Sequence, residues 1–566
     1  MLVSDLLIHE ALMRSPIRLL LPLALACLAG CPVWEPLASC ADYDACETTT
    51  TAGGSSEGTL PTTSASDGVQ TVTGASDHED STSPGTESGV ETGDSTSTGQ
   101  PVELPEIIDH LITPNPIDTN GPIAVTVTAE HAAGVRMDTG LGAVVELVPQ
   151  PQPGVFIGEF PVLTGLLNGP QAALLTPWKD VVDGETVEVP FEIALPTPGS
   201  QKLWETGDLI GPGQVAALAT LPTGKVVELG NYSPNGEPRC FLRMRDEDGL
   251  WALADVVDVL PDTPCMAIDL KIDAQGALFV LVQQQGNDGM RWRLLKVPAW
   301  GLGAQHMGIG AKDEVAVALA HHESGMVGVC GTAPTGQLDQ VDAMTQIFRP
   351  GLPSEPWVVD YKPPEKMAHI FTERTRDCVF VGDTLALVGE AYGHHGLELK
   401  QRDRLFILRL DTAAKIDAWS IALPGDKLQS GAQAVDVDDA GRLVIGGYTC
   451  DDDCKPLGDL RIYDGQDTLV WQTSLGPFST KSFAVQDLAW SPAGYAVVAT
   501  GGGAGNEAAF TVRAFAPSQV EALWTFSRKD LQVLHLALAL AIGNYGEVYG
   551  GGLGANGYPA VAFIAG

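Results

Sequence analysis

Positive charge is scarce in this chain of 566 residues. Lys and Arg number 32 against 71 Asp and Glu, which gives a formal net charge of −39. A surface with this balance repels phosphate backbones and anionic headgroups, so we expect no nucleic-acid partner. Charged residues make up only 18% of the chain, and Gly reaches 64 residues. This composition favours a turn-rich, all-β protein over a helical one.

Signatures of common enzyme chemistries are also missing. The sequence has no P-loop and no Cys-x-x-Cys pair, which argues against Walker-type phosphoryl transfer and against a redox role. The run His321-His322-Glu323 lacks the His-Glu-x-x-His spacing that places two imidazoles on one helix face. We therefore predict no catalytic residues and no organic cofactor, and the sequence favours a non-enzymatic function.

The N-terminus has an apolar run that is too short to span a membrane. Arg14 and Arg18 precede this run, residues 19–26, and Leu-Ala-Gly-Cys follows at 28–31. This pattern is typical of a secretory signal peptide. Its ending resembles the lipobox of bacterial lipoproteins, which implies that Cys31 carries the lipid and begins the mature chain. We predict a signal peptide over residues 1–30 and a lipid-anchored protein of the bacterial envelope, at the outer membrane. Translation from Met1 and from Met13 both remain open.

Large apolar residues are nearly absent from the segment that follows. Residues 47–104 consist mainly of Thr, Ser, Gly, Asp and Glu, and no Lys or Arg occurs between Arg18 and Arg136. Such a composition cannot bury enough apolar surface to offset the entropy of ordering. We predict a disordered tether over residues 31–104, in contact with the membrane through the lipid anchor only.

Residues 105–196 show a different, alternating pattern. Segments such as 123–128, 155–160 and 186–193 alternate apolar and polar residues between Pro, Gly and Asn turns. Short strands at this spacing predict a small two-sheet sandwich, similar to bacterial immunoglobulin-like stalk domains. A spacer role is favoured over an adhesive one.

From residue 197 onward a Trp recurs roughly every 50 residues at the same place in a repeated strand pattern. The pattern is clearest over residues 432–475, where four apolar segments alternate with turns and end in a Trp. Four strands in each repeat predict a β-propeller over residues 197–566. We expect these Trp residues to pack between blades. They are Trp204, Trp251, Trp300, Trp357, Trp419, Trp471 and Trp524.

The two ends of the repeat array predict how the ring closes. The last repeat, residues 531–566, supplies three strands and no Trp, whereas Trp204 has no strands of its own before it. A strand around Trp204 that completes the last blade would give seven blades and remove an exposed sheet edge.

Cysteine usage fits an oxidising compartment. We expect Cys40 to pair with Cys46, and Cys450 with Cys454. Cys265 and Cys378 are expected at the start of innermost strands, with Cys240 and Cys330 on the preceding blades. The predicted staples between neighbouring blades are therefore Cys240–Cys265 and Cys330–Cys378, on the face that carries the long loops.

Candidate binding residues lie in those long loops, where a ligand would bind. Asp451, Asp452 and Asp453 could hold a divalent cation, and His394-His395 could bind metal or ligand. Asp436, Asp438 and Gly441 resemble the start of a calcium loop but lack its final Glu, and a tight turn explains them better. The candidates are Tyr232, Asn287, Tyr392, His394, His395, Tyr448, Asp451 and Tyr558.

The repeats resemble the Asp-x-x-Gly…Gly-Tyr-Thr repeats of bacterial secreted seven-bladed propellers, most closely at residues 438–449. This resemblance implies the fold and not the ligand. We predict an anchored extracytoplasmic head that binds or scaffolds a protein or glycan. The alternative is a hydrolase or lyase that acts on polysaccharide, with its site at the mouth of the propeller channel.

Overall fold

The computed structural model describes residues 103–566 with short gaps in the propeller. The predicted signal peptide, Cys31, the tether, Cys40 and Cys46 lie outside the described residues. The described part contains no α-helix, and no helix in it is long and apolar enough to cross a membrane. The gaps are 207–211, 234–235, 246–256, 262, 287–288, 301, 336–339, 351, 361–369, 395–400, 413–418, 423–428, 451–455, 478–483, 502–508, 529–535 and 555–558.

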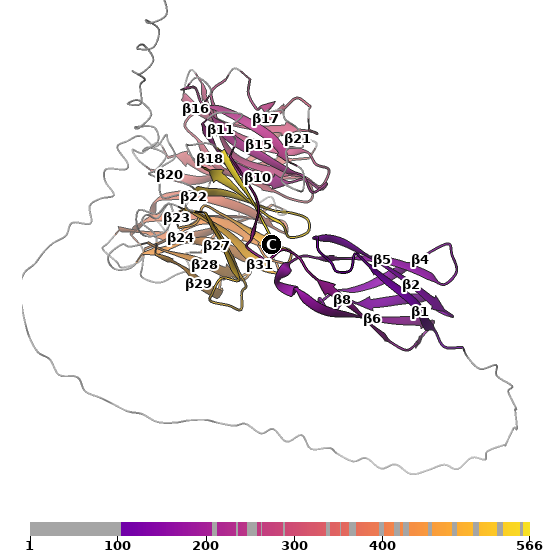
Figure 1. Ribbon diagram of the computed structural model, residues 1–566. Coiled ribbons are helices and arrows are strands. Elements are labelled where there is room, and N and C mark those ends of the chain that lie inside the picture. Colours follow the sequence, from indigo (N-terminus) through magenta and orange to yellow (C-terminus); the bar gives the residue numbers. More distant parts are fainter. Residues whose placement is uncertain are drawn as a thin grey trace, which may run out of the picture. The chain divides into compact units, whose positions relative to one another are not determined.

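Eight strands form the first β unit (Figure 1). They pair in the order β1-β2-β5-β4-β3-β6-β7, and β8 pairs with β6. The alternation seen in the sequence is real burial: in β2 every second residue from Gly121 to Ala129 is buried. The strands are β1 (Glu106–Thr113), β2 (Gly121–Glu130), β3 (Gly134–Asp138), β4 (Val144–Pro149), β5 (Val155–Val162), β6 (Gly169–Lys179), β7 (Val182–Asp183) and β8 (Val187–Ile193).

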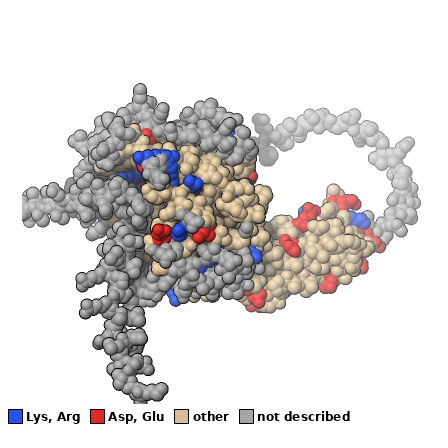
Figure 2. Space-filling view, turned by 90° about the horizontal axis from the view of Figure 1, so that it is seen from above, with Lys and Arg blue, Asp and Glu red and all other residues tan. Residues whose placement is uncertain are grey.

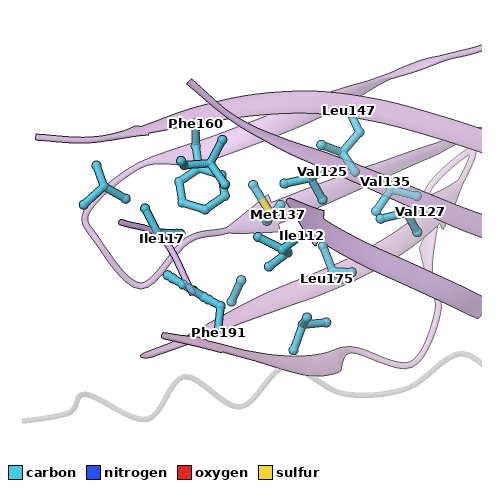
Figure 3. Close-up of a cluster of buried hydrophobic side chains, with 14 of the residues drawn as sticks. Ile112, Ile117, Val125, Val127, Val135, Met137, Leu147, Phe160, Leu175 and Phe191 are labelled. Carbon is cyan, nitrogen blue, oxygen red and sulfur yellow. The ribbon is translucent and has the colours of Figure 1, made fainter. Parts of the chain in front are cut away.

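One hydrophobic cluster holds this unit together. Side chains from both halves of the pairing order meet in it, such as Val125 of β2, Phe160 of β5 and Phe191 of β8 (Figure 3). The rings of Phe160 and Phe191 meet edge to face, with centroids 5.7 Å apart. The unit carries 12 acidic residues and only two basic ones, Arg136 and Lys179, over residues 105–196.

The rest of the described chain forms seven four-stranded antiparallel sheets, which confirms the expected all-β seven-bladed propeller. We number the blades 1 to 7 in chain order, from the blade that begins with β10 to the blade that begins with β34. The strands of blades 1 to 3 are β10 (Gly213–Thr220), β11 (Val226–Tyr232), β12 (Arg239–Arg245), β13 (Val257–Asp258), β14 (Cys265–Ile272), β15 (Leu278–Gly286), β16 (Gly289–Val297), β17 (Gln305–Ile309), β18 (Val315–His321), β19 (Val327–Pro334), β20 (Val341–Arg349) and β21 (Leu352–Asp360).

Blades 4 to 7 repeat the same meander. Their strands are β22 (Ile370–Val381), β23 (Thr384–His394), β24 (Gln401–Asp411), β25 (Trp419–Ala422), β26 (Ser430–Val437), β27 (Leu443–Cys450), β28 (Pro456–Tyr463), β29 (Leu469–Pro477), β30 (Asp487–Ser491), β31 (Tyr495–Gly501), β32 (Phe510–Phe515), β33 (Trp524–Arg528), β34 (Leu536–Ile542), β35 (Val548–Leu553) and β36 (Pro559–Ile564).

Ring closure takes place as predicted. Strand β9 (Gln201–Thr206) pairs antiparallel with β36 and becomes the fourth strand of blade 7, with Trp204 opposite Ala562. The first strands of successive blades contact one another around the whole ring, including β10 with β34. In Figure 1 the yellow C-terminal strands accordingly lie against β10 of the first blade.

Five of the recurring Trp residues, Trp204, Trp357, Trp419, Trp471 and Trp524, lie on fourth strands, and Trp251 lies outside the described residues. Trp524 in β33 is buried and meets Tyr495 edge to face at 6.4 Å between centroids. Trp300 and Trp471 pack, partly buried, against the hydrophobic clusters of their blades. Packing within and between blades therefore accounts for these three Trp residues, as expected.

Both predicted staples between blades are present. Cys240 in β12 is bonded to Cys265 in β14, and Cys330 in β19 to Cys378 in β22. All four residues are buried. The expected Cys450–Cys454 pair cannot be placed, because Cys454 lies outside the described residues.

The position of the second staple corrects the sequence interpretation. We expected Cys378 at the start of an innermost strand, as Cys265 is. It lies near the end of β22 instead, because residues 370–375 of this longer strand already pair with β23. Cys330 likewise lies in the middle of β19. The second disulfide therefore crosses the interior of the blades, and only the first begins at the loop-bearing end.

Candidate functional site

Four carboxylates and one ammonium group face one another on the first strands of the blades. Asp269 and Lys271 lie on β14, and the other carboxylates come one each from β22, β26 and β30. They are Asp269, Asp377, Asp436 and Asp487, and all four interact electrostatically with Lys271. We call these five residues the inner ring.

Each carboxylate of the inner ring makes the same pair of hydrogen bonds. One oxygen accepts from the amide of the next residue in its own strand, at 2.7 to 2.8 Å. The other oxygen accepts from a backbone amide on the first strand of the next blade. Asp269 takes the amide of Leu319 (2.7 Å), Asp377 that of Val435 (2.8 Å), Asp436 that of Trp490 (2.6 Å) and Asp487 that of Leu540 (2.7 Å).

Burial and mutual repulsion set the protonation of the inner ring. Burial raises the pKa of Asp377 to about 8 and that of Asp487 to about 7, although the Lys271 ammonium and the amide hydrogen bonds act in the opposite direction. Burial also raises the pKa of Asp436. For Lys271, burial lowers the pKa, but the surrounding carboxylates outweigh it and raise the pKa above its usual value.

The Lys271 ammonium is the positive centre of the inner ring. Its Nζ lies 3.6 Å from Asp269 Oδ2, and 42% of its side-chain surface is accessible. Carboxylates from four blades interact electrostatically with the ammonium. The inner ring therefore holds one fixed cation and carboxyl groups that titrate near neutral pH, next to each other.

A second polar cluster lies between blades 4 and 5. The carboxylate of Glu390 on β23 accepts hydrogen bonds from Gln433 Nε2 (2.9 Å), the Tyr448 hydroxyl (3.2 Å) and Arg376 Nη2 (3.3 Å). Gly431 makes room for it, because a Cβ there would lie 2.7 Å from Glu390 Cγ. Tyr448 is fully buried, and burial, with Glu390 second, raises its pKa well above the usual value.

The structure places four of the eight candidate binding residues. Tyr392 is half-buried on β23, two residues after Glu390, whose cluster contains Tyr448, and His394 ends the same strand. Tyr232 ends β11 in blade 1, where its hydroxyl bonds Asp258 and burial raises its pKa to about 12. Three of the candidates thus lie on blades 4 and 5. Asn287, His395, Asp451 and Tyr558 lie outside the described residues.

The motif that resembles a calcium loop is a tight turn, as expected. Asp438 Oδ1 accepts the amides of Ala440 (3.0 Å) and Arg442 (2.9 Å), and the Gly441 amide closes the turn onto the Asp438 carbonyl. His322 fills the equivalent slot in blade 3, where its Nδ1 accepts the Ser324 amide at 3.1 Å. The described residues contain no group of three or more His, Cys, Asp or Glu arranged to hold a metal, and Asp451–Asp453 lie in a gap.

Sequence reasoning missed the inner ring except for Asp436, which it assigned to a turn. A signal was available in two of the strands: Asp269 and Asp436 each follow small or apolar residues, as in Ala267-Ile268-Asp269-Leu270. A charged residue at such a position needs a buried partner. The pattern could not reveal that the partner is a backbone amide of the following blade.

Comparisons with known proteins assign this chain to no family. No family model and no curated protein sequence matches the chain. A polysaccharide lyase of family PL25, an ulvan lyase, is 9% identical over 64% of this chain and 96% of its own, with a TM-score of 0.39. An oligogalacturonate lyase in complex with manganese is 10% identical, covering 70% and 98%, with a TM-score of 0.40. Sqt1 from Chaetomium thermophilum is 13% identical, covering 62% and 81%, with a TM-score of 0.37. These likenesses are too low to support an argument about activity.

Proposed function

We propose that this chain is a bacterial lipoprotein that presents its propeller outside the cytoplasm as a binding or scaffolding head. The lipid on Cys31 anchors it at the outer membrane, residues 31–104 act as a tether, and the β1–β8 unit serves as an immunoglobulin-like stalk. The two disulfides fit an extracytoplasmic protein.

The observation that carries the binding role is the cross-linked ring. Strand β9 closes it, and two disulfides join neighbouring blades. A rigid scaffold of this kind positions the loops between second and third strands, where binding residues concentrate. Tyr392 and His394 stand at the end of β23 where such a loop begins, beside the Glu390 cluster that fixes β23 to blade 5.

Charge narrows the ligand class. Basic side chains form a group on the face of Figure 2, and Asp and Glu occur there in smaller groups, so the net charge does not appear as a uniform acidic field on that face. A protein or neutral glycan ligand meets no long-range barrier at such a surface, whereas a polyanion would be repelled by the chain as a whole.

The binding role is tested with the mature chain in which Cys31→Ser removes the anchor. Immobilised protein is incubated with a detergent-solubilised envelope fraction and with a panel of neutral polysaccharides. We expect retention of one ligand that Tyr392→Ala and His394→Ala each reduce and that Asp439→Asn, an exposed change on a hairpin turn, leaves unchanged. Equal retention by all four proteins would contradict a site on blades 4 and 5.

The alternative function is a polysaccharide-acting hydrolase or lyase with its site at the mouth of the propeller channel. The observation that favours it is the inner ring, because a carboxyl group with its pKa near neutrality can donate or accept a proton at working pH. Release of reducing ends or unsaturated products from a polysaccharide, lost in Asp487→Asn, would replace the binding role with this one.

A further inference from the structure

Every blade has a comparable residue on its first strand, identified by its place after a bulge or before a turn. In blades 1 to 5 and 7 this bulge precedes the residue directly. Blade 6 is aligned through its turn instead. The turn Ser491–Gly494 has the same hydrogen bond as Asp438–Gly441 of blade 5, and superposing the two turns in the sequence places Asp487 opposite Ala434. We call it the central position. Its occupants in order are Ala217, Asp269, Ala318, Asp377, Ala434, Asp487 and Ala539.

Aspartate at the central position connects its blade to the next one. Asp269 joins blade 2 to blade 3, Asp377 joins blade 4 to blade 5, and Asp487 joins blade 6 to blade 7. In each case the bonded amide belongs to the residue after the Ala at the next central position. The three aspartates therefore hold three of the seven junctions.

The same aspartates cannot be bridged from the blade before them. Each already accepts the amide of its own following residue, namely Leu270, Cys378 or Leu488. That amide is therefore not available to a carboxylate on the preceding blade. The junctions from blade 1 to 2, 3 to 4 and 5 to 6 need another connection.

These three junctions are connected in two ways. Between blades 5 and 6, Asp436 sits two residues beyond the central position and accepts the Trp490 amide. Blades 1 and 3 hold Ala both at the central position and two residues beyond it, so neither can supply a carboxylate to the next blade. The junctions that follow these two blades are the ones that Cys240–Cys265 and Cys330–Cys378 cross. The seventh junction, from blade 7 to blade 1, is crossed by the strand exchange of β9.

We propose that the two disulfides form a redox-sensitive latch that divides the ring into two arcs. A dithiol reductant transfers two electrons and two protons to each disulfide, which leaves two thiols and an oxidised dithiol. Blades 2 and 3 then remain joined by Asp269, and blades 4 to 7 by Asp377, Asp436 and Asp487. The junctions on both sides of blades 2 and 3 lose their disulfide cross-link, so this pair loosens as a unit.

Weaker contacts remain at the two reduced junctions. Asn231 Oδ1 still accepts the Ala267 amide at 2.6 Å, and Glu373 still shares a hydrogen bond with Asp342. The apolar clusters across these junctions also persist, since they do not depend on the cysteines alone. Reduction is therefore expected to raise local opening and not to unfold the ring.

Hydrogen exchange of the full mature chain tests the latch. Exchange is followed by mass spectrometry before and after treatment with a dithiol, and the new thiols are counted by alkylation. We expect amides of β14 to β20 to exchange about 30-fold faster or more after reduction, while those of β26 to β36 change little. An equal increase in all seven blades, or no increase once alkylation of Cys240, Cys265, Cys330 and Cys378 shows both staples reduced, would overturn the proposal.

Substitutions separate the two disulfides. Replacing one pair, Cys240→Ala with Cys265→Ala or Cys330→Ala with Cys378→Ala, leaves blades 2 and 3 held on one side. We expect the variant with all four substitutions to increase exchange by more than the sum of the increases in the two double variants. Asp436→Asn is the matched control and should loosen blades 5 and 6 in both redox states. Additive effects of the two pairs would contradict a unit held from both sides.

Discussion

Asp377 and Val435 lie on neighbouring blades and are joined by a hydrogen bond of 2.8 Å from the Val435 amide to Asp377 Oδ2. The other oxygen of Asp377 caps the Cys378 amide in its own strand at 2.7 Å. One buried carboxylate thus satisfies two backbone amides on two blades. A backbone amide left without a partner inside a protein costs about 1 to 3 kcal/mol, so the side chain at this position affects the stability of the ring.

Asp377→Ala is expected to destabilise the protein, because both amides lose their acceptor. The expected loss in free energy of unfolding is about 2 to 4 kcal/mol, and Asp377→Asn, which keeps one acceptor oxygen, should lose less. Urea unfolding followed by fluorescence measures both. Asp439→Asn, on an exposed turn, is the control and should match the parent protein within about 0.5 kcal/mol. An Asp377→Ala protein as stable as this control would contradict the bridging role.

Stability is expected to fall as pH rises toward alkaline values. The pKa of Asp377 is raised from 3.8 to about 8 and that of Asp487 to about 7 by burial. A group with a raised folded-state pKa contributes stability that is complete below its unfolded pKa and is lost as pH rises through its folded pKa. Free energies of unfolding measured between about pH 4 and pH 8 should therefore decrease with pH.

The amide variant isolates the contribution of Asp377 to this pH dependence. Asp377→Asn has no proton to lose, so its stability should vary less over the same range. Asp269, Asp436, Asp487 and Lys271 remain as the charged groups of the inner ring and account for the residual slope. A steeper slope in Asp377→Asn than in the parent protein would be inconsistent with the raised pKa.

Removal of strand β9 is expected to open the ring. A chain that begins at residue 197 keeps β9, and one that begins at residue 209 lacks it and leaves the outer edge of β36 unpaired. The shorter chain should melt about 5 °C lower or more. Calorimetry of the two chains side by side measures this, and identical melting temperatures would show that closure does not depend on β9.

Tyr448 and Glu390 are expected to be energetically coupled across blades 4 and 5. Tyr448→Phe removes the hydroxyl that bonds Glu390, and Glu390→Gln removes the charge that it faces. A double-mutant cycle by urea unfolding should give a coupling energy of about 0.5 to 3 kcal/mol. The pair Tyr232→Phe with Glu390→Gln, on different blades, should be additive. Zero coupling between Tyr448 and Glu390 would contradict a stabilising contact between blades 4 and 5.

The lipid anchor is tested by labelling. Cells expressing the chain are fed a clickable fatty acid, and the protein is isolated and probed for the label. We expect label on the parent protein and none on Cys31→Ser, because thioether attachment requires the thiol. Label retained by Cys31→Ser would contradict the lipobox assignment.

Repetition in the sequence was enough to predict the propeller. The recurring Trp, the turn at Asp438–Gly441 and the incomplete last repeat correctly gave seven blades closed by the strand around Trp204. The two disulfides between blades were also predicted from the same register. The position of Cys378 near the end of β22 was not predicted, because the length of β22 depends on its pairing with β23 and not on the local sequence pattern.

The sequence by itself determined the identity and spacing of the repeats, since each strand and turn reflects local alternation and local hydrogen bonding. Only the tertiary structure decided what connects one blade to the next. The hydrogen bond from the Leu319 amide to Asp269 joins residues 50 positions apart on different sheets. The sequence pattern of a single repeat therefore cannot reveal it. An amide that caps the aspartate of its own strand cannot also be bridged from the blade before it, and that competition exists only when the blades stand side by side.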